Sequence, residues 1–395
     1  MEVRVRRGDT FYYYSQLFYL PLPLISDSNP GVSSSALQIG QTVRIPGFYA
    51  GQYTIQPGDS LWGIARSRNL AVDALLLLNQ DLNPNALQAG TVIDVPLRIT
   101  RPVVMGQQAY SSEVLEKDIN RLIYAFPFVR VNKIGESVLG KPLFEILIGN
   151  GPKKVHIDAS FHANEWITTP ILMRFMNEYL LSLVNRGAIR GVVTEPLYNN
   201  ITLSLVPMVN PDGVDLVITG PPASLRERLI EINKGSTDFS GWKANINGVD
   251  LNNQYPAKWE LEKERKEEKS PAPRDFPGYK PLSEPESIAM AELARRGDLD
   301  RVLALHTQGE EFYWGYEGLE PPEAEMLAEE FERVSGYRSV RYIDSYAGYK
   351  DWFIQEFQRP GFTVELGKGI NPLPLSQFNQ IYESVLGIFL VAIYR

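Results

Sequence analysis

Two of the three histidines in this chain of 395 residues are placed where they could bind a metal ion. His162 and His306 directly follow the segments VHIDASF and RVLAL, whose apolar character is typical of buried strands. Glu165 lies three residues after His162, so both side chains can reach one ion. Two imidazoles and one carboxylate leave the fourth position of a zinc ion open, which is typical of a catalytic site. These residues predict one catalytic Zn2+.

The spacing of His162 and Glu165 is weak evidence by itself. Because the chain has 47 acidic residues among 395, an acidic residue follows a histidine at this distance about one time in eight by chance. The hypothesis therefore depends on the elements that must bring His306 to the same place.

From residue 110 onward, apolar strands alternate with amphipathic helices. We expect strands at 154–161, 201–209, 302–305 and 361–366, and helices at 169–184, 284–296 and 322–335. This alternation predicts an α/β domain with helices on both faces of the sheet. Ligands bind outside the carboxyl ends of strands in such sheets, which is where both histidines are expected. Residues 258–269 carry five acidic and five basic side chains and predict a solvated helix.

The first 98 residues contain a repeat with an offset of 50 residues. Gly8-Asp9-Thr10 recurs as Gly58-Asp59-Ser60, and Asn29 recurs as Asn79. Such self-similarity is typical of duplicated small modules. In the second copy, short strands are expected near residues 53–55 and 92–95, with two helices between them. Ser60 is expected to cap the first of these helices.

This strand–helix–helix–strand order resembles the LysM module, which binds glycans that contain N-acetylglucosamine, such as peptidoglycan and chitin. We expect the first repeat at 1–48 and the second at 51–98. The first is degenerate, since residues 11–24 are rich in aromatic side chains and contain two prolines. The resemblance implies that the glycan lies between two loops, with Gly58, Asp59, Ser60 and Asn79 as the candidate binding residues.

Five motifs within residues 105–395 are similar in order and context to those of the zinc carboxypeptidase (carboxypeptidase A) family. They are His162–Ile167, Asn210–Gly213, Gly248–Asn252, His306 and Phe362–Leu366. The resemblance implies a catalytic domain over 105–395, with a mixed central sheet and one Zn2+ held by His162, Glu165 and His306.

The resemblance also implies roles for residues around the metal. Glu365 would be the general base, which takes a proton from the attacking water and passes it to the leaving amine. Asp250 would orient His162 through the imidazole nitrogen that does not face the metal. Lys243 stands where the family has an arginine facing the developing oxyanion, and it supplies a point charge instead of a planar fork.

The chain departs from the family on the substrate side. Asn253, which follows Asn252, replaces the arginine that anchors a terminal carboxylate, and Asn164 replaces a second arginine. Both changes argue against ordinary exopeptidase action. Lys350 occupies the position that contacts the side chain beyond the cut bond, so an acidic group is expected there. The active-site tyrosine of the family corresponds to Tyr342 or Tyr346.

A wall-binding module joined to this altered peptidase resembles the bacterial γ-D-glutamyl-L-diamino-acid endopeptidases. These enzymes cut between γ-D-glutamate and meso-diaminopimelate (or lysine) in peptidoglycan stem peptides, and Lys350 could pair with the extra carboxylate of diaminopimelate. Two alternatives remain open. One is a conventional metallocarboxypeptidase with a preference for acidic residues, and the other is a glycan-binding adaptor with an inactive peptidase domain.

Composition limits the other possibilities. The formal net charge is −8 without a basic block, so nucleic acid is not an expected partner. Cysteine is absent, which excludes disulfides and thiolate chemistry. No apolar run is long enough to span a membrane. Residues 1–9 lack the features of a signal peptide, so we expect synthesis in the cytoplasm and access to wall material during sporulation, lysis or recycling.

Overall fold

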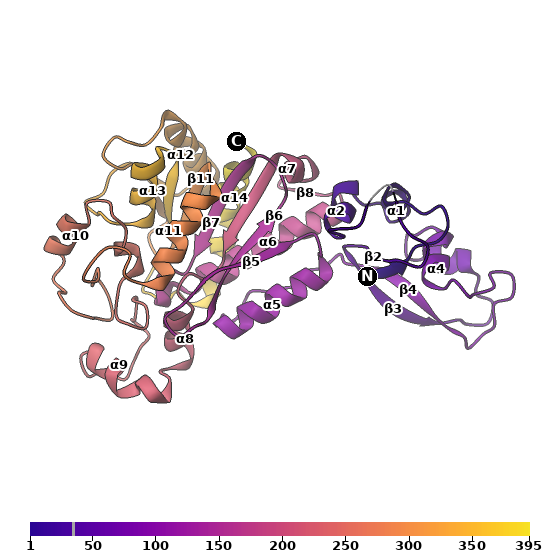
Figure 1. Cartoon of the computed structure of the whole chain (residues 1–395), viewed down its shortest axis with the longest axis horizontal. Coiled ribbons are helices and arrows are strands. Elements are labelled where there is room, and N and C mark those ends of the chain that lie inside the picture. Colours follow the sequence, from indigo (N-terminus) through magenta and orange to yellow (C-terminus); the bar gives the residue numbers. More distant parts are fainter. Residues whose placement is uncertain (34–35) are drawn as a thin grey trace. The chain divides into compact units, whose positions relative to one another are not determined.

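A computed structural model describes residues 1–33 and 36–395 of the chain. The described residues form two compact units, which are treated separately below (Figure 1). The first unit contains Met1–Val104, Asp118–Arg130 and Met176–Pro196, and the second contains the remainder. The segments 118–130 and 176–196 thus belong to the same unit as the repeats.

Each repeat folds as strand, helix, helix, strand, as predicted. The first repeat contains β1 (Glu2–Arg4), α1 (Phe11–Leu17), α2 (Leu22–Asp27) and β2 (Thr42–Arg44), and the second contains β3 (Phe48–Thr54), α3 (Leu61–Arg66), α4 (Val72–Leu78) and β4 (Val92–Arg98). In both repeats the two strands pair antiparallel. A short hairpin of β8 (Ala188–Ile189) and β9 (Val192–Val193) also lies in this unit.

Equivalent residues of the two repeats make equivalent hydrogen bonds. Thr10 caps α1 by accepting from the Tyr13 N–H, and Ser60 caps α3 by accepting from the Gly63 N–H, as expected for Ser60. Asn79 exchanges two hydrogen bonds with the backbone of Asp94, just as Asn29 does with Arg44 fifty residues earlier. The sequence repeat therefore reflects a repeated scaffold.

The second unit is built on an eight-stranded mixed sheet. In spatial order it contains β13 (Arg338–Val340), β12 (Glu311–Tyr313), β14 (Gly361–Glu365), β11 (Arg301–His306), β7 (Lys153–Ala159), β10 (Ile201–Val206), β6 (Pro142–Ile148) and β5 (Arg130–Glu136). The central strands β14, β11, β7 and β10 run parallel, whereas β12 and β6 pair antiparallel with them. Four of these strands, β7, β10, β11 and β14, were predicted. The other four, β5, β6 and the short β12 and β13, were not.

Helices connect and cover these strands. The α-helices are α5 (Ser112–Ala125), α6 (Thr168–Val184), α7 (Glu195–Asn200), α8 (Pro211–Thr219), α9 (Arg226–Ile232), α10 (Trp259–Arg265), α11 (Pro285–Gly297), α12 (Pro322–Ser335), α13 (Tyr349–Phe357) and α14 (Phe378–Tyr394). Single 3-10 turns occur at η1 (Ala163–Glu165), η2 (Ala223–Leu225), η3 (Leu251–Asn253) and η4 (Leu375–Gln377).

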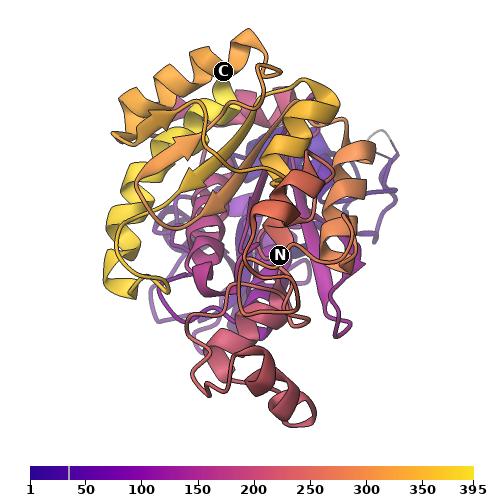
Figure 2. The same cartoon turned by 90° about the vertical axis from the view of Figure 1, so that its left-hand side faces the viewer.

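Both faces of the sheet are covered, as the α/β prediction requires (Figure 2). On one face, α11 and α13 pack on Val302 and Ala304 of β11 in a cluster that includes Trp352. On the other, α12 and α14 pack against each other, and Phe331 of α12 contacts Phe362 of β14 with ring centroids 4.8 Å apart. Because both faces are buried, these strands read as continuous apolar runs.

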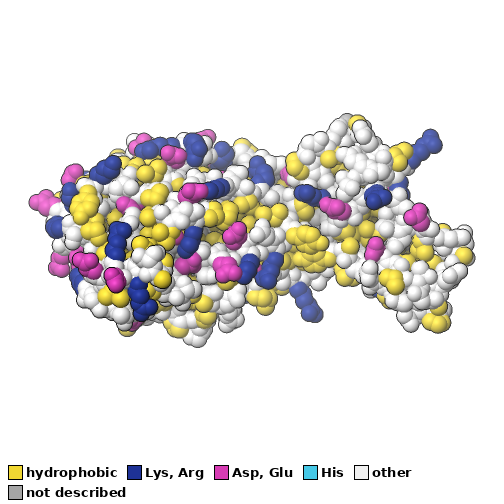
Figure 3. All heavy atoms as spheres, turned by 60° about the horizontal axis from the view of Figure 1, so that its bottom comes forward, with side chains coloured by type: hydrophobic (Ala, Val, Ile, Leu, Met, Phe, Trp, Pro, Cys, Tyr) yellow, Lys and Arg dark blue, Asp and Glu magenta, His cyan; other side chains and the backbone are white. Residues whose placement is uncertain are grey.

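On the face drawn in Figure 3, Lys and Arg side chains are interspersed with Asp and Glu and form no large basic area. Within residues 1–33 and 36–395, no helix combines the length and apolar character that crossing a bilayer requires.

Candidate metal centre and active site

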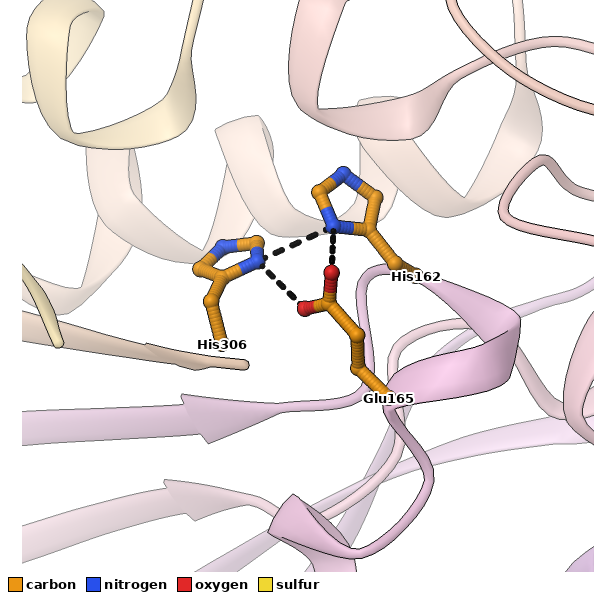
Figure 4. Close-up of side chains that lie close together, drawn as sticks. All are labelled: His162, Glu165 and His306. Atoms are coloured by element: carbon orange, nitrogen blue, oxygen red, sulfur yellow. Dashed lines mark hydrogen bonds and ion pairs between the residues drawn. The ribbon is translucent and has the colours of Figure 1, made fainter. Parts of the chain in front are cut away.

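The three predicted metal ligands converge at the carboxyl edge of the sheet. His162 lies just beyond β7, Glu165 lies in the 3-10 turn that follows, and His306 is the last residue of β11. The Nδ1 atoms of His162 and His306 are 3.1 Å apart, and each lies 2.9 Å from a different oxygen of the Glu165 carboxylate (Figure 4). All three side chains are buried. The ligand atoms lie within 4.8 Å of one another.

This donor set fits zinc. Ligand atoms bound tetrahedrally to zinc at about 2.0–2.1 Å lie about 3.3 Å apart, close to the spacings seen here. His162 contacts Asp250 through Nε2, at 3.2 Å from Oδ1, which fixes the Nε2–H tautomer and leaves the Nδ1 lone pair facing the other two ligands. Two imidazoles and one carboxylate are therefore oriented for an ion with one open position.

Asp250 also connects His162 to Lys243. The Lys243 Nζ lies 3.1 Å from Asp250 Oδ2 and 3.9 Å from Asp275. Burial raises the pKa of Asp250, but Lys243 and His162 outweigh it and hold the pKa well below its usual value. Burial lowers the pKa of Lys243, but Asp250, Glu165 and Asp275 raise it above its usual value overall. Lys243 thus remains a cation beside the metal ligands.

The register of β14 against β11 places Glu365 at the metal site. In the parallel pair of β11 and β14, Glu365 is the partner of His306. Burial raises the pKa of Glu365 to about 8; His306 opposes this shift and the nearby Glu165 carboxylate adds to it. A carboxylate with a raised pKa is suited to accept and return a proton near neutral pH.

The motif at 210–213 holds the loops of the site together, a role that the sequence did not reveal. Asn210 donates to the carbonyls of Phe161, next to His162, and of Ala244, next to Lys243, and it accepts from the N–H of Gly213. A Cβ at Gly213 would lie 2.6 Å from Asn210 Oδ1, so glycine is required there. The motif in the sequence was the only signal for this role.

A second buried network supports the turn that precedes Asp250. Asn245 accepts from the N–H groups of Asn247 and Val249, and its amide donates to Glu284 and Glu286 at the start of α11. Burial raises the pKa of Glu286 to about 7, and its contacts with Val138 and Asn245 oppose the shift. Glu286 is thus a buried carboxyl that resists ionisation.

Glu286 should make the protein less stable as the pH rises from acid to neutral. Its pKa is about 7 in the folded protein and 4.5 for an ordinary glutamate, so between these pH values the unfolded chain releases a proton that the folded chain keeps. The free energy of unfolding should therefore fall by about 3 kcal/mol over this range and level off above it. Chemical denaturation of Glu286→Gln should lack this slope. Glu292→Gln, an exposed change on the same helix, should retain it.

The predicted substrate-side asparagines lie beside the metal ligands or Asp250. Asn164 lies in η1 beside Glu165 and is buried, and its Oδ1 has no hydrogen-bond partner among the described residues. Asn252 and Asn253 lie in η3, directly after Asp250. Asn252 Oδ1 accepts from the Tyr349 N–H, which ties η3 to the start of α13. Substrate binding by these residues stays a prediction.

Lys350 and both candidate tyrosines line one cavity of about 660 Å³. Lys350 is buried, and its ammonium contacts Asp351 and the Gly315 carbonyl. Tyr342 is half exposed and donates to Glu320, whereas the Tyr346 ring lies beneath Lys258. The structure gives neither tyrosine a contact with the metal ligands, so the choice between them stays a prediction.

The predicted glycan-binding side chains serve the fold of the second repeat. Asp59 accepts from the Gln56 N–H and the Tyr53 hydroxyl, Ser60 caps α3, and the Asn79 amide is bound to backbone groups. Gly58 has a positive φ of 87°, which glycine adopts without strain. A glycan contact at these positions stays a prediction.

An open metal site with an adjacent carboxylate base, at the carboxyl edge of a mixed sheet, defines a metal-dependent hydrolase. The sequence profile described as zinc carboxypeptidase matches residues 117–386, and the LysM domain profile matches residues 3–46 and 53–96. The chain belongs to the zinc carboxypeptidase family and carries two LysM domains, as the motifs predicted.

Relatives are similar over long stretches of the chain. A γ-D-glutamyl-L-diamino acid endopeptidase 1 from Lysinibacillus sphaericus is 56% identical over 396 residues, which cover all of both chains. The protein YqgT from Bacillus subtilis is 50% identical over 304 residues, or 75% of this chain and 81% of that one. Bovine thrombin-activatable fibrinolysis inhibitor superposes with a TM-score of 0.58 at 20% identity, covering 73% of this chain and 97% of the other. The last match supports the fold alone.

Proposed function

We propose that the protein is a zinc-dependent peptidoglycan hydrolase that cuts the bond between γ-D-glutamate and meso-diaminopimelate or lysine in stem peptides. The convergence of His162, Glu165 and His306 beside Glu365 carries the hydrolase assignment. The substrate class is supported by the relative from Lysinibacillus sphaericus, which is similar over its whole length. Activity during sporulation, lysis or recycling of the wall stays a prediction.

The residues of the site divide the chemistry among them. Zinc, when bound, supplies a Lewis acid that polarises the scissile carbonyl and activates water. Glu365 accepts the proton of the attacking water and returns it to the leaving amine, a cycle that a raised pKa favours. Lys243 places a positive charge beside the ligands, where it can oppose charge on the carbonyl oxygen. Asp250 keeps His162 in the required tautomer.

The missing arginines favour cleavage within a chain over removal of a terminal residue. Asn253 and Asn164 stand where the family resemblance predicts arginines, and neutral amides cannot form a charged clamp on a terminal carboxylate. Asn164 is buried with an unpartnered Oδ1, so it can accept a substrate N–H. A conventional carboxypeptidase would need the clamp, and an inactive adaptor would have no need of the complete set of ligands and base.

Mass spectrometry of muropeptides digested by the zinc-loaded protein tests the proposal. The expected products carry a terminal γ-D-glutamate and a new diaminopimelate amino group. The same bond should be cut in stem peptides that end at the diamino acid and in those that extend beyond it. Release of single residues from the carboxyl end of the extended peptides, with the γ-D-glutamyl bond left intact, would instead support a carboxypeptidase.

Lys350 should determine the preference for diaminopimelate over lysine. Replacement by methionine keeps the length of the side chain and removes its charge, which should lower the ratio of kcat/KM values for the two substrates about tenfold. The ratio is the measurement, because a general loss of folded protein cancels in it. Lys368→Met, at a largely exposed lysine, should leave the ratio unchanged. An unaltered ratio in Lys350→Met would refute this role.

A further inference from the structure

A cavity of about 560 Å³ lies between the two repeats. We call it the inter-repeat cavity and define it by Gln16, Tyr19, Trp62, Arg66 and Asn69, which are among its lining residues. Its volume falls within the range of about 300–1,000 Å³ that is common for small-molecule sites. It is lined by the end of α1, by α3 and by the α3–α4 turn. None of the four predicted glycan-binding residues lines it.

Two exposed aromatic rings dominate this cavity. Tyr19 is 62% exposed and Trp62 is 60% exposed, which is high for side chains of this size. The Arg66 guanidinium lies 4.7 Å from the centroid of the Trp62 ring, and Arg186 lies 4.7 Å from that of Tyr19. Each arginine covers one ring face and holds the ring in place. The exposed surface must therefore come from the opposite face and the edges.

The remaining lining is mixed. It includes the apolar side chains of Leu17, Ala65, Leu70, Ala71 and Val72, with polar groups among them. Gln16 and Asn69 offer amide donors and acceptors, and Arg66 offers guanidinium donors. An aromatic face beside such groups is complementary to a pyranose ring, whose C–H face is apolar and slightly positive and whose rim carries hydroxyl and acetamido groups. A peptide helix that binds through an apolar face would need a larger continuous apolar surface than this cavity provides.

The cavity is held open by contacts between the repeats. Arg6 of the first repeat binds Asp73 of the second through both guanidinium nitrogens, with an Nη1–Oδ1 distance of 2.9 Å, and Tyr13 donates to the same carboxylate. Gln80 adds a hydrogen bond to the Arg4 carbonyl. Because the two walls are fixed before a ligand arrives, binding requires little ordering.

We propose that the inter-repeat cavity is a second glycan-binding site, in which a chain of β-linked N-acetylated hexosamines stacks on Trp62 and Tyr19. The choice of a wall glycan rests on the proposed function. The site is distinct from the loop at 58–60 and from Asn79, whose side chains are engaged within their own repeat. Both repeats would then bind the same glycan chain, which raises the affinity for an insoluble substrate.

Trp62 provides a direct optical test in the full-length protein. The other five tryptophans are buried, so fluorescence accessible to acrylamide should come from Trp62. A β-1,4-linked N-acetylglucosamine hexasaccharide should shift this emission to the blue and protect it from quenching. Calorimetry with the same sugar should give a Kd about tenfold higher for Trp62→Ala, and a value near wild type for Trp62→Phe, which keeps an aromatic ring.

Two further variants test the geometry. Tyr12→Ala removes a ring that is 65% exposed on the same helix as Gln16 but does not line the cavity, so its Kd should be unchanged. Asp73→Ala removes the clamp without touching either ring and should weaken binding. Wild-type affinity in both Trp62→Ala and Tyr19→Ala, or equal weakening in Tyr12→Ala, would overturn the inference.

Hydrolysis of a soluble stem peptide separates this inference from the proposed function. Trp62→Ala should cut such a peptide at the wild-type rate. If the peptide is not cut while sugar binding depends on Trp62, the proposed cleavage is wrong and the glycan site stands. If the peptide is cut and sugar binding does not depend on Trp62, the glycan site alone is wrong.

Discussion

Glu365→Gln should lower kcat for stem-peptide cleavage about a thousandfold, within the range of about 10²–10⁴ that general acid–base catalysis contributes. The amide cannot take the proton of the attacking water or return it to the leaving amine. The zinc ligands are untouched, so KM and metal content should remain close to wild type. Steady-state kinetics with a soluble diaminopimelate peptide, together with metal analysis, would measure both effects.

The control for this experiment is another glutamate in the same unit. Glu356 lies on α13, nine residues before Glu365, and is exposed. Glu356→Gln should have wild-type kcat. If Glu365→Gln keeps more than about a tenth of the wild-type kcat, the catalytic proton transfer must belong to another group, because one general base is expected to contribute at least about a hundredfold.

Loss of one ligand should remove zinc and activity together. His306→Ala deletes one of two imidazoles, leaving His162 and Glu165 as a two-ligand site that cannot hold the ion tightly. We expect less than stoichiometric zinc after dialysis and kcat/KM at least about a thousandfold lower, since the metal polarises the scissile carbonyl. Zinc should also cease to raise the melting temperature, because a ligand stabilises the folded state only where it binds.

The third histidine provides a matched control. His156 is buried on β7, contacts Ser204 and Asp158, and is not part of the metal cluster. His156→Gln should keep zinc in stoichiometric amount, even if its melting temperature falls. Full zinc content in His306→Ala, measured by plasma emission spectroscopy, would contradict the proposed ligand set.

Local signals in the sequence predicted four of the eight strands of the central sheet and the two repeats. Strands ending at His162 and His306 follow from apolar runs, because strands buried on both faces have no polar alternation. The cap at Ser60 follows from its side chain, which can accept from the free N–H groups of a helix start. The offset of 50 residues between the repeats predicted two copies of one module. Family resemblance then supplied roles for Glu365, Asp250 and Lys243.

Tertiary structure decided what each side chain contacts. A solvated helix was predicted at 258–269, and α10 confirms a helix over part of this range. It is not solvated on all sides, because Glu262 is fully buried and pairs with Lys266 and Arg265. The sequence places Lys350 at a position that determines specificity in the family. In the structure its ammonium group already contacts the Asp351 carboxylate and the Gly315 carbonyl. Glu262 also accepts from the Tyr346 N–H, and the Lys350 ammonium donates to the Gly315 carbonyl. Composition cannot reveal these two contacts, because the partners come from other segments of the chain.

The sequence alone therefore determined which elements form and which residue types end them, since periodicity and capping act over a few residues. The convergence of His162 with His306, separated by 144 residues, and the pairing of His306 with Glu365 required the order and register of the sheet. The inter-repeat cavity is likewise lined by residues of two modules, which contact each other through pairs such as Arg6 with Asp73. Register and module contacts are fixed by the packing of distant surfaces, and no short stretch of sequence encodes them.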